Sequence, residues 1–447
     1  MPAGNDQPHA AWLHGELPGW VKDGVLTDEA AQLLRARYPA VADADAMLQR
    51  QARSTHWAMV LFGILGAVLI GGGIILLLAH NWDQLSRPAR VAVAFAPLVL
   101  SQALAFWMLW TDRGTTVWRE TVGTFLALMV GACIALISQT YNLGGDFAEF
   151  MLVWTLLSLP VAYLLRATLP AVWFCIAAAI WGSSMEWEER GNALWFWPLL
   201  ALVLPLWWIE GRQNRYHPRP VLLAWAIAGA GCFGVAFACV REWRGHHWML
   251  AYAGWYAFLY MAGRRWFPEG RTIWHRPFQF IGVVGSATMA LMLTFDWPWR
   301  ELQQSLPHAT EFTSQPLSWL AVFLWPALAA LLWLESLWRR DTPAAIVGAF
   351  PGFVAVAMSL QSGSAGSAQA LFNSYVFTTS VALLVTGVRR HQLGTVNGGM
   401  LILSALVLCR FFDSDLGFVL RGVVFIVLGA GFLITNVLLL RRKRAAP

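Results

Sequence analysis

The sequence predicts an all-α fold: a polytopic transmembrane bundle of about 14 helices, with both termini in the cytoplasm and a short helical head. Hydrophobic residues make up 58% of the 447 residues and charged residues only 13%, about half of the share usual in soluble domains. Apolar runs long enough to cross a bilayer follow one another, and basic residues are concentrated in alternate loops. Because lipid solvates apolar faces, a bilayer explains a composition that no soluble core could cover.

Residues 1–55 are predicted to form a cytosolic helical head. Apolar residues recur at helical spacing before a break at Asp23-Gly24: Trp12, Leu13, Leu17, Trp20 and Val21. Thr27 is a natural N-cap for a second helix, in which Asp28 and Glu29 would face the positive end of the helix dipole. We expect a helical hairpin at the inner membrane surface, with these residues on the buried side of its second helix: Leu33, Leu34 and Tyr38.

The rest of the chain divides into apolar runs separated by short polar segments. Residues 56–165 would hold the first four spans, 166–440 the remaining bundle, and 441–447 a basic cytosolic tail. The runs cover residues 58–79, 90–110, 121–138, 150–165, 168–184, 193–209, 221–240, 248–262, 278–297, 317–337, 344–360, 370–388, 395–410 and 418–440. The number of spans depends most on the narrow gap after residue 165 and on the short run 248–262.

The distribution of basic residues predicts the orientation. If the N-terminus is inside and the spans alternate, inner segments hold 23 of the 31 basic residues. The outer segments hold the other 8: Arg87, Arg90, Arg190, Arg241, Arg244, Arg300, Arg410 and Arg421. This asymmetry favours an even number of spans in a multi-pass membrane protein.

Small residues recur at every fourth position in several runs. Examples are Gly63, Ala67 and Gly71; Gly123, Ala127, Gly131 and Ala135; Ala226, Ala230, Gly234 and Ala238; and Gly282, Ser286 and Ala290. Such stripes let helix backbones approach closely in lipid. We expect packing within one chain, with a homo-oligomer seam as the alternative.

Several classes of function are disfavoured. The net charge of +6 comes from basic residues scattered over short loops, so we expect no nucleic-acid partner. The 5 cysteines lie in apolar runs without a CxxC motif, and HExxH, GxxxxGK[ST] and GxSxG are absent from the sequence, so we expect no metal and no cofactor. The runs hold almost no charge, which argues against a proton pump or a voltage sensor.

Polar residues gather in the predicted outer segments. The candidate ligand-binding residues are Asn81, Trp82, Asp83 and Arg87; Gln139, Tyr141, Asp146 and Glu149; and Arg410, Asp413 and Arg421. If these segments meet, the carboxylates would supply acceptors, and the guanidinium groups would grip a phosphate or carboxylate. The structural alternative is that the same residues cap helices, form re-entry turns and neutralise one another.

Three functions fit this pattern. The first is binding or translocation of a lipid-linked or anionic cell-envelope ligand at an outer-facing polar pocket, with the lipid bilayer as the constant partner. The second is a membrane-embedded enzyme that uses Asp83, Asp146 or Glu149 as an acid or base. The third is a sensor or assembly protein that acts through the cytosolic head. We favour the first, and no catalytic residue is assigned.

Three stretches resemble the bacterial membrane-protein family catalogued as domain of unknown function 2157. They are residues 24–34 (GVLTDEAAQLL), a glycine-rich first span that ends in Asn81-Trp82-Asp83, and residues 139–146 (QTYNLGGD) leading into 150–154. Residues 410–413 (RFFD) are also similar to the C-terminal part of that family. The resemblance would cover about residues 10–165. It implies an inner-membrane protein and supplies no mechanism.

Overall fold

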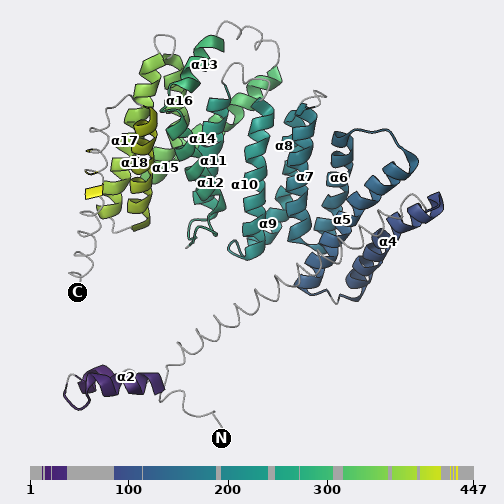
Figure 1. Ribbon diagram of the computed structural model, residues 1–447, viewed down its shortest axis with the longest axis horizontal. Helices are drawn as coiled ribbons and strands as arrows, with labels where there is room; N and C mark the ends of the chain where they lie inside the picture. Colours follow the sequence, from purple (N-terminus) through teal and green to yellow (C-terminus); the bar gives the residue numbers. More distant parts are fainter. Residues whose placement is uncertain are drawn as a thin grey trace. The chain divides into compact units, whose positions relative to one another are not determined.

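The computed structural model describes residues 13, 16–21, 23–37, 85–112, 114–187, 193–239, 247–270, 272–305, 316–360, 365–389, 393–413, 423, 426 and 429–430. These residues form helices and the turns between them, with no β-strand among them (Figure 1). The predicted all-α class is therefore confirmed for this part of the chain. The chain divides into two units, Met1–Arg90 and Val91–Pro447, each of which is considered by itself.

The described part of the first unit contains the predicted helical hairpin. A helical stretch over residues 16–21 ends in a turn where Gly24 has a φ of 71°, a left-handed conformation that favours glycine. Helix α2 (Asp28–Arg37) follows, and the Thr27 Oγ1 accepts a hydrogen bond from the Ala30 N–H at 3.3 Å. The predicted N-cap is thus confirmed, and it satisfies one of the amide groups left open at a helix start.

The predicted buried side of α2 is wrong at Leu33. This side chain is 72% exposed, whereas Ala31 and Leu17 are buried and Leu34 is half-buried. Leu33 follows Ala31 by two residues, a rotation of about 200° around the helix, so the two cannot face the same neighbour. A single preceding helix covers only one side of α2. Trp12 and Tyr38 lie outside the described residues.

The described part of the second unit is a bundle of helices whose chain neighbours mostly pack side by side (Figure 1). The helices are α4 (Arg87–Thr111, which begins at the end of the first unit), α5 (Thr116–Tyr141), α6 (Phe147–Leu165), α7 (Thr168–Trp187), η2 (Ala193–Trp195), α8 (Phe196–Ala201), α9 (Leu204–Gln213), α10 (Pro218–Cys239), α11 (Trp248–Trp266), α12 (Pro277–Met292), α13 (Trp297–Ser305), α14 (Pro316–Trp338), α15 (Thr342–Gly348), α16 (Phe350–Leu360), α17 (Ala365–Arg389) and α18 (Leu393–Asp413). Every predicted run between residues 90 and 410 lies on one or more of these helices. The run 58–79 and nearly all of 418–440 lie outside the described residues.

Eight described helical segments are long and apolar enough to cross a membrane, or 9 if one bent pair counts as a single span. The bent pair is α12 and α13, whose axes differ by 73°. The run predicted at 278–297 therefore ends at Met292 as a straight helix. Pro298 follows as the second residue of α13, a position at which its missing N–H costs nothing.

The run predicted at 193–209 is also interrupted. It starts with the 3₁₀ turn η2, and α8 ends at Ala201 before α9 begins at Leu204. The Leu202 and Val203 N–H groups bond the carbonyls of Leu199 and Leu200, so the chain tightens locally. Pro205 has no N–H with which to continue α8, and it occupies the first turn of α9 instead.

Small residues in the predicted stripes receive bulky neighbours from other helices. A methyl group at Gly131 of α5 would overlap the Trp154 ring of α6. The Trp154 Nε1 donates to the Ala127 carbonyl of α5 at 2.7 Å, so the ring both packs and bonds. Gly234 in the same way makes room for Phe196. At these positions the small side chains serve packing within the chain.

Several loops at one end of this unit are joined by ion pairs and hydrogen bonds. The Arg215 Nη1 donates to the Trp266 carbonyl at 3.3 Å, which joins the loop before α10 to the end of α11. The Arg264 guanidinium donates two hydrogen bonds of 2.8 Å to the Asp341 carboxylate, which caps α15. All of these segments are among those predicted to be inner by their basic residues. We refer to this end as the basic end.

Candidate functional site

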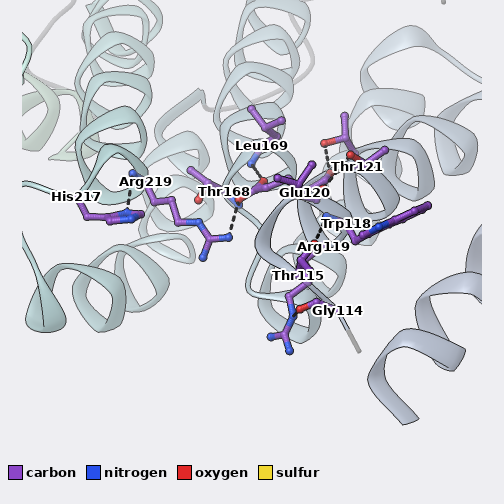
Figure 2. A network of polar contacts seen from close by, with 12 residues as sticks. Gly114, Thr115, Trp118, Arg119, Glu120, Thr121, Thr168, Leu169, His217 and Arg219 are labelled. Atoms are coloured by element: carbon purple, nitrogen blue, oxygen red, sulfur yellow. Dashed lines mark hydrogen bonds and ion pairs between the residues drawn. The ribbon is translucent and has the colours of Figure 1, made fainter. Parts of the chain in front are cut away.

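One polar cluster at the basic end is built around the Glu120 carboxylate, in the second turn of α5 (Figure 2). Its Oε1 accepts from the Thr168 N–H and its Oε2 from the Leu169 N–H, both at 2.8 Å. These two amides open α7, where intrahelical acceptors are missing. A carboxylate at this position also interacts favourably with the positive end of the helix dipole. Glu120 therefore fastens the start of α7 to α5.

Arg219 brings a third helix to the same carboxylate. Its Nη2 lies 3.4 Å from Glu120 Oε1, and the two side chains are only 19% and 16% exposed. Arg219 is near the start of α10, where its N–H donates to the His217 Nδ1 at 3.4 Å (Figure 2). The cluster thus links the second turn of α5 to the first turns of α7 and α10. All four contacts are intramolecular, so we assign this cluster a structural role.

The predicted outer residues in and around the turn between α5 and α6 all lie within the described part of the chain. Asn142 ends α5 in the left-handed conformation, and the Ser138 hydroxyl donates to the Leu143 carbonyl at 3.2 Å. The Asp146 Oδ1 accepts from the Glu149 N–H at 2.6 Å and caps α6. The cap expected as the structural alternative is thus present.

The side chains predicted to fix a ligand in this turn are exposed: Gln139, Tyr141 and Glu149. Arg87, in the first turn of α4, is exposed as well.

Arg410 lies on α18 and contacts the end of α12. Its Nη2 donates to the Thr294 carbonyl and, at 3.1 Å, to the Thr294 hydroxyl, while its guanidinium lies over the Phe295 ring. The Asn373 amide of α17 donates to the same carbonyl at 3.2 Å. Thr294 lies in the turn just after α12, so both side chains fasten this turn to α17 and α18.

The hydrogen bonds described above for the predicted outer residues fall into separate groups. Those of Asp146 and Ser138 stay within α5, α6 and their turn, whereas those of Arg410 are with α12. Asn81, Trp82, Asp83 and Arg421 lie outside the described residues, as does the side chain of Asp413. A single outer pocket formed by all of these residues therefore stays a prediction.

A cleft with a volume of about 470 Å³ lies between α10, α11 and α12. Its wall on α12 follows one helix face, which is formed by Ile281, Val284, Gly285, Thr288, Met289 and Met292. Trp248, Tyr252 and Tyr256 line it from α11, and Cys232 from α10. Except for a few hydroxyls and one thiol, the lining is apolar.

The aromatic side of the cleft depends on a glycine. A Cβ at Gly285 would overlap the Tyr256 ring, so the missing side chain lets this ring lie against α12. Tyr252 lies one helical turn earlier, with its ring centroid 5.6 Å from that of Tyr256. The Tyr252 hydroxyl donates to the Cys232 carbonyl at 3.0 Å and thereby fixes the ring against α10.

The arrangement of the cleft suits an elongated apolar molecule. Volumes of this size are typical of small-molecule sites, and aromatic walls are common in them. Within the described part of the chain, no group of three or more His, Cys, Asp or Glu side chains converges as a metal site would require. The sequence signal for the cleft is weak, since any lipid-facing helix shows the same apolar spacing.

These features define a helical membrane protein with several candidate membrane-spanning helices, which fits a multi-pass location. Residues 18–171 match the family model described as "Predicted membrane protein (DUF2157)", and this match confirms the resemblance seen in the sequence. The matched segment reaches from the head to the first turn of α7, and the cleft lies beyond it. No curated protein and no solved structure matches the chain.

Proposed function

We propose that this protein binds a lipid-type ligand, whose hydrocarbon chain occupies the cleft between α10, α11 and α12. The observation that carries this proposal is the cleft of about 470 Å³ with its continuous apolar lining. In water such a surface would favour association with another protein. Next to candidate membrane spans, the surrounding solvent is itself hydrocarbon, so an acyl or prenyl chain is the natural occupant.

The exposure of the lining supports entry from the side of the bundle. Val284 is 45% exposed although it lines the cleft, and Phe280 and Thr288 are also exposed. A chain could therefore move in laterally from the bilayer without crossing a polar entrance. This differs from the polar, outer-facing pocket expected from the sequence. An anionic headgroup remains compatible with the proposal, but the cleft itself contributes no charge.

Two neighbouring valines on α12 allow a matched test. Val284 lines the cleft, whereas Val283 does not, and the two are 45% and 38% exposed. Val284→Trp should fill part of the cleft and displace about two methylene groups of the ligand. At ~0.8 kcal/mol for each methylene, affinity should fall about tenfold, while Val283→Trp should change it little.

The measurement is lipid photocrosslinking in nanodiscs, with a phospholipid that carries a diazirine in one acyl chain. We expect adducts on the α11 and α12 residues of the cleft in the wild-type protein and in Val283→Trp, and a strong reduction in Val284→Trp. Equal labelling in both variants would show that the chain does not occupy the cleft.

We also propose that the basic end faces the cytoplasm and that the full chain has about 14 spans. The clustering of the predicted inner segments at this end supports the orientation, as does the bias of their basic residues. Single-cysteine labelling with a membrane-impermeant maleimide in intact cells tests it, in a background that lacks the native cysteines. Cysteine at Gly144 should be labelled from outside and cysteine at Asn214 only after lysis; the reverse pattern contradicts the orientation.

A further inference from the structure

Two of the residues that line the apolar cleft are Tyr256 on α11 and Thr288 on α12, and each has a hydroxyl group. Neighbouring hydroxyls behave differently: Tyr252 bonds the Cys232 carbonyl, and Thr294 bonds the Leu291 carbonyl at 2.6 Å. For Tyr256 and Thr288, the described part of the chain offers no hydrogen-bond partner.

The position of the Tyr256 ring is fixed by its contact with α12. The ring lies in the notch left by Gly285, so α12 holds it in place along its length. A threonine can turn its hydroxyl back to a carbonyl of its own helix. A phenol oxygen, at the far end of a ring, lacks this option. The Tyr256 hydroxyl is thus a donor held among apolar side chains.

Such a donor carries an energetic consequence in a membrane. A hydroxyl group without a hydrogen bond in an apolar medium loses the free energy of its hydration. The hydrocarbon core of a membrane contains no water that could accept its proton. A bare hydrocarbon chain in the cleft would leave this cost in place. A ligand with an oxygen acceptor beside its chain would remove it. The cleft therefore discriminates between lipids by an acceptor near the chain, and not by the chain alone.

We propose that the cleft selects ester-linked acyl lipids, with an ester carbonyl accepting a hydrogen bond from Tyr256 and a second contact at Thr288. This inference rests on the proposed function and names its ligand class. An acyl ester has a strong carbonyl acceptor at the head of each chain, whereas ether-linked and prenyl lipids have only weak acceptors there. The cleft thus distinguishes lipids that have nearly the same hydrophobic bulk.

The experiment compares two probes: dioleoyl phosphatidylglycerol and its dioleyl ether analogue, which share the headgroup and the chain length. Each is titrated into the delipidated full chain in detergent, and native mass spectrometry counts the bound lipid. For the wild-type protein we expect the ester lipid to bind about three- to tenfold more tightly, the usual range for one hydrogen bond. Tyr256→Phe should abolish this preference and leave ether-lipid binding unchanged.

Tyr163→Phe is the matched control, because Tyr163 lies on α6 and does not line the cleft; its hydroxyl donates to the Leu202 carbonyl. It should keep the preference for the ester lipid. Equal binding of both lipids to the wild type would overturn this inference and leave the proposed function standing, as would a preference that survives Tyr256→Phe. If neither lipid binds, or if Val284→Trp binds both as well as the wild type does, the proposed function fails and this inference fails with it.

Discussion

The helices α5–α7 and α10–α12 use the same packing device with different results. In both, an aromatic ring fills the notch of a glycine on a neighbouring helix: Trp154 over Gly131 in the first group, and Tyr256 over Gly285 in the second. Trp154 also bonds the backbone of α5, which closes the helices on each other. Tyr256 has no such bond to the neighbouring helix, and a cleft opens beside it. Of these two rings, the one that donates to the neighbouring helix belongs to a closed contact, and the one without such a bond lies beside the cleft.

The largest expected effect on stability concerns the hydrogen bonds by which Glu120 joins α5 to α7. Glu120→Ala removes both acceptors at the start of α7 and the carboxylate beside Arg219. We expect a loss of about 2–3 kcal/mol in the free energy of unfolding, below the full cost of breaking a buried pair because the side chains are not completely buried. Thermal unfolding of the detergent-solubilised chain, followed by circular dichroism, measures the loss. Glu149→Ala, which removes an exposed carboxylate, should stay within about 0.5 kcal/mol of wild type.

The second effect tests the glycine notch. Gly131→Ala forces the Trp154 ring to move and should cost about 1–3 kcal/mol. Gly398→Ala is the matched control, since Gly398 also lies within a helix but has no atom within 4 Å of an added Cβ. It should be neutral or stabilising by up to about 1 kcal/mol, because alanine favours helix. Equal unfolding midpoints for the two variants would mean that the notch is not required.

The smallest effect concerns the turn between α5 and α6. Asp146→Ala removes the N-cap of α6 and should cost about 1 kcal/mol. Asp146→Asn keeps an oxygen acceptor and should retain most of the stability. Unfolding midpoints under the same conditions measure both changes. If the two substitutions destabilise equally, the negative charge of Asp146 is required. A simple N-cap would need only an oxygen acceptor.

The helix positions were largely predictable from the sequence, because a membrane requires long apolar runs and the backbone must satisfy itself within helices. The same argument could not locate the interruption at residues 202–203 or the bend after Met292. At both places the composition stays apolar, and the break depends on where a proline removes one N–H. At Leu33 a periodic pattern gave the wrong face, since spacing alone does not say which side a neighbour covers.

The sequence predicted the polar turn at Asp146 but neither the Glu120 cluster nor the cleft, and the outer pocket stays a prediction. Polar residues near helix ends were correctly noticed, but Asp146 caps a helix, which is the structural alternative. Glu120 and Arg219 are 99 residues apart in the sequence, and no local pattern relates them. The cleft depends on the absence of a side chain at Gly285 and on the ring that uses this space. Such features arise from three helices together and leave little trace in any one of them.

The contact between Glu120 and the start of α7 has a consequence for how the protein is made. During synthesis α5 is made before α7. The Glu120 carboxylate therefore has no amide donors from α7 until about fifty more residues have been added. We expect the start of α5 to remain at the water interface until α7 has been made. The helices α5, α6 and α7 can then pack together. The segment that matches the family model ends at residue 171, so it contains Glu120 and both amide donors but only the first turn of α7.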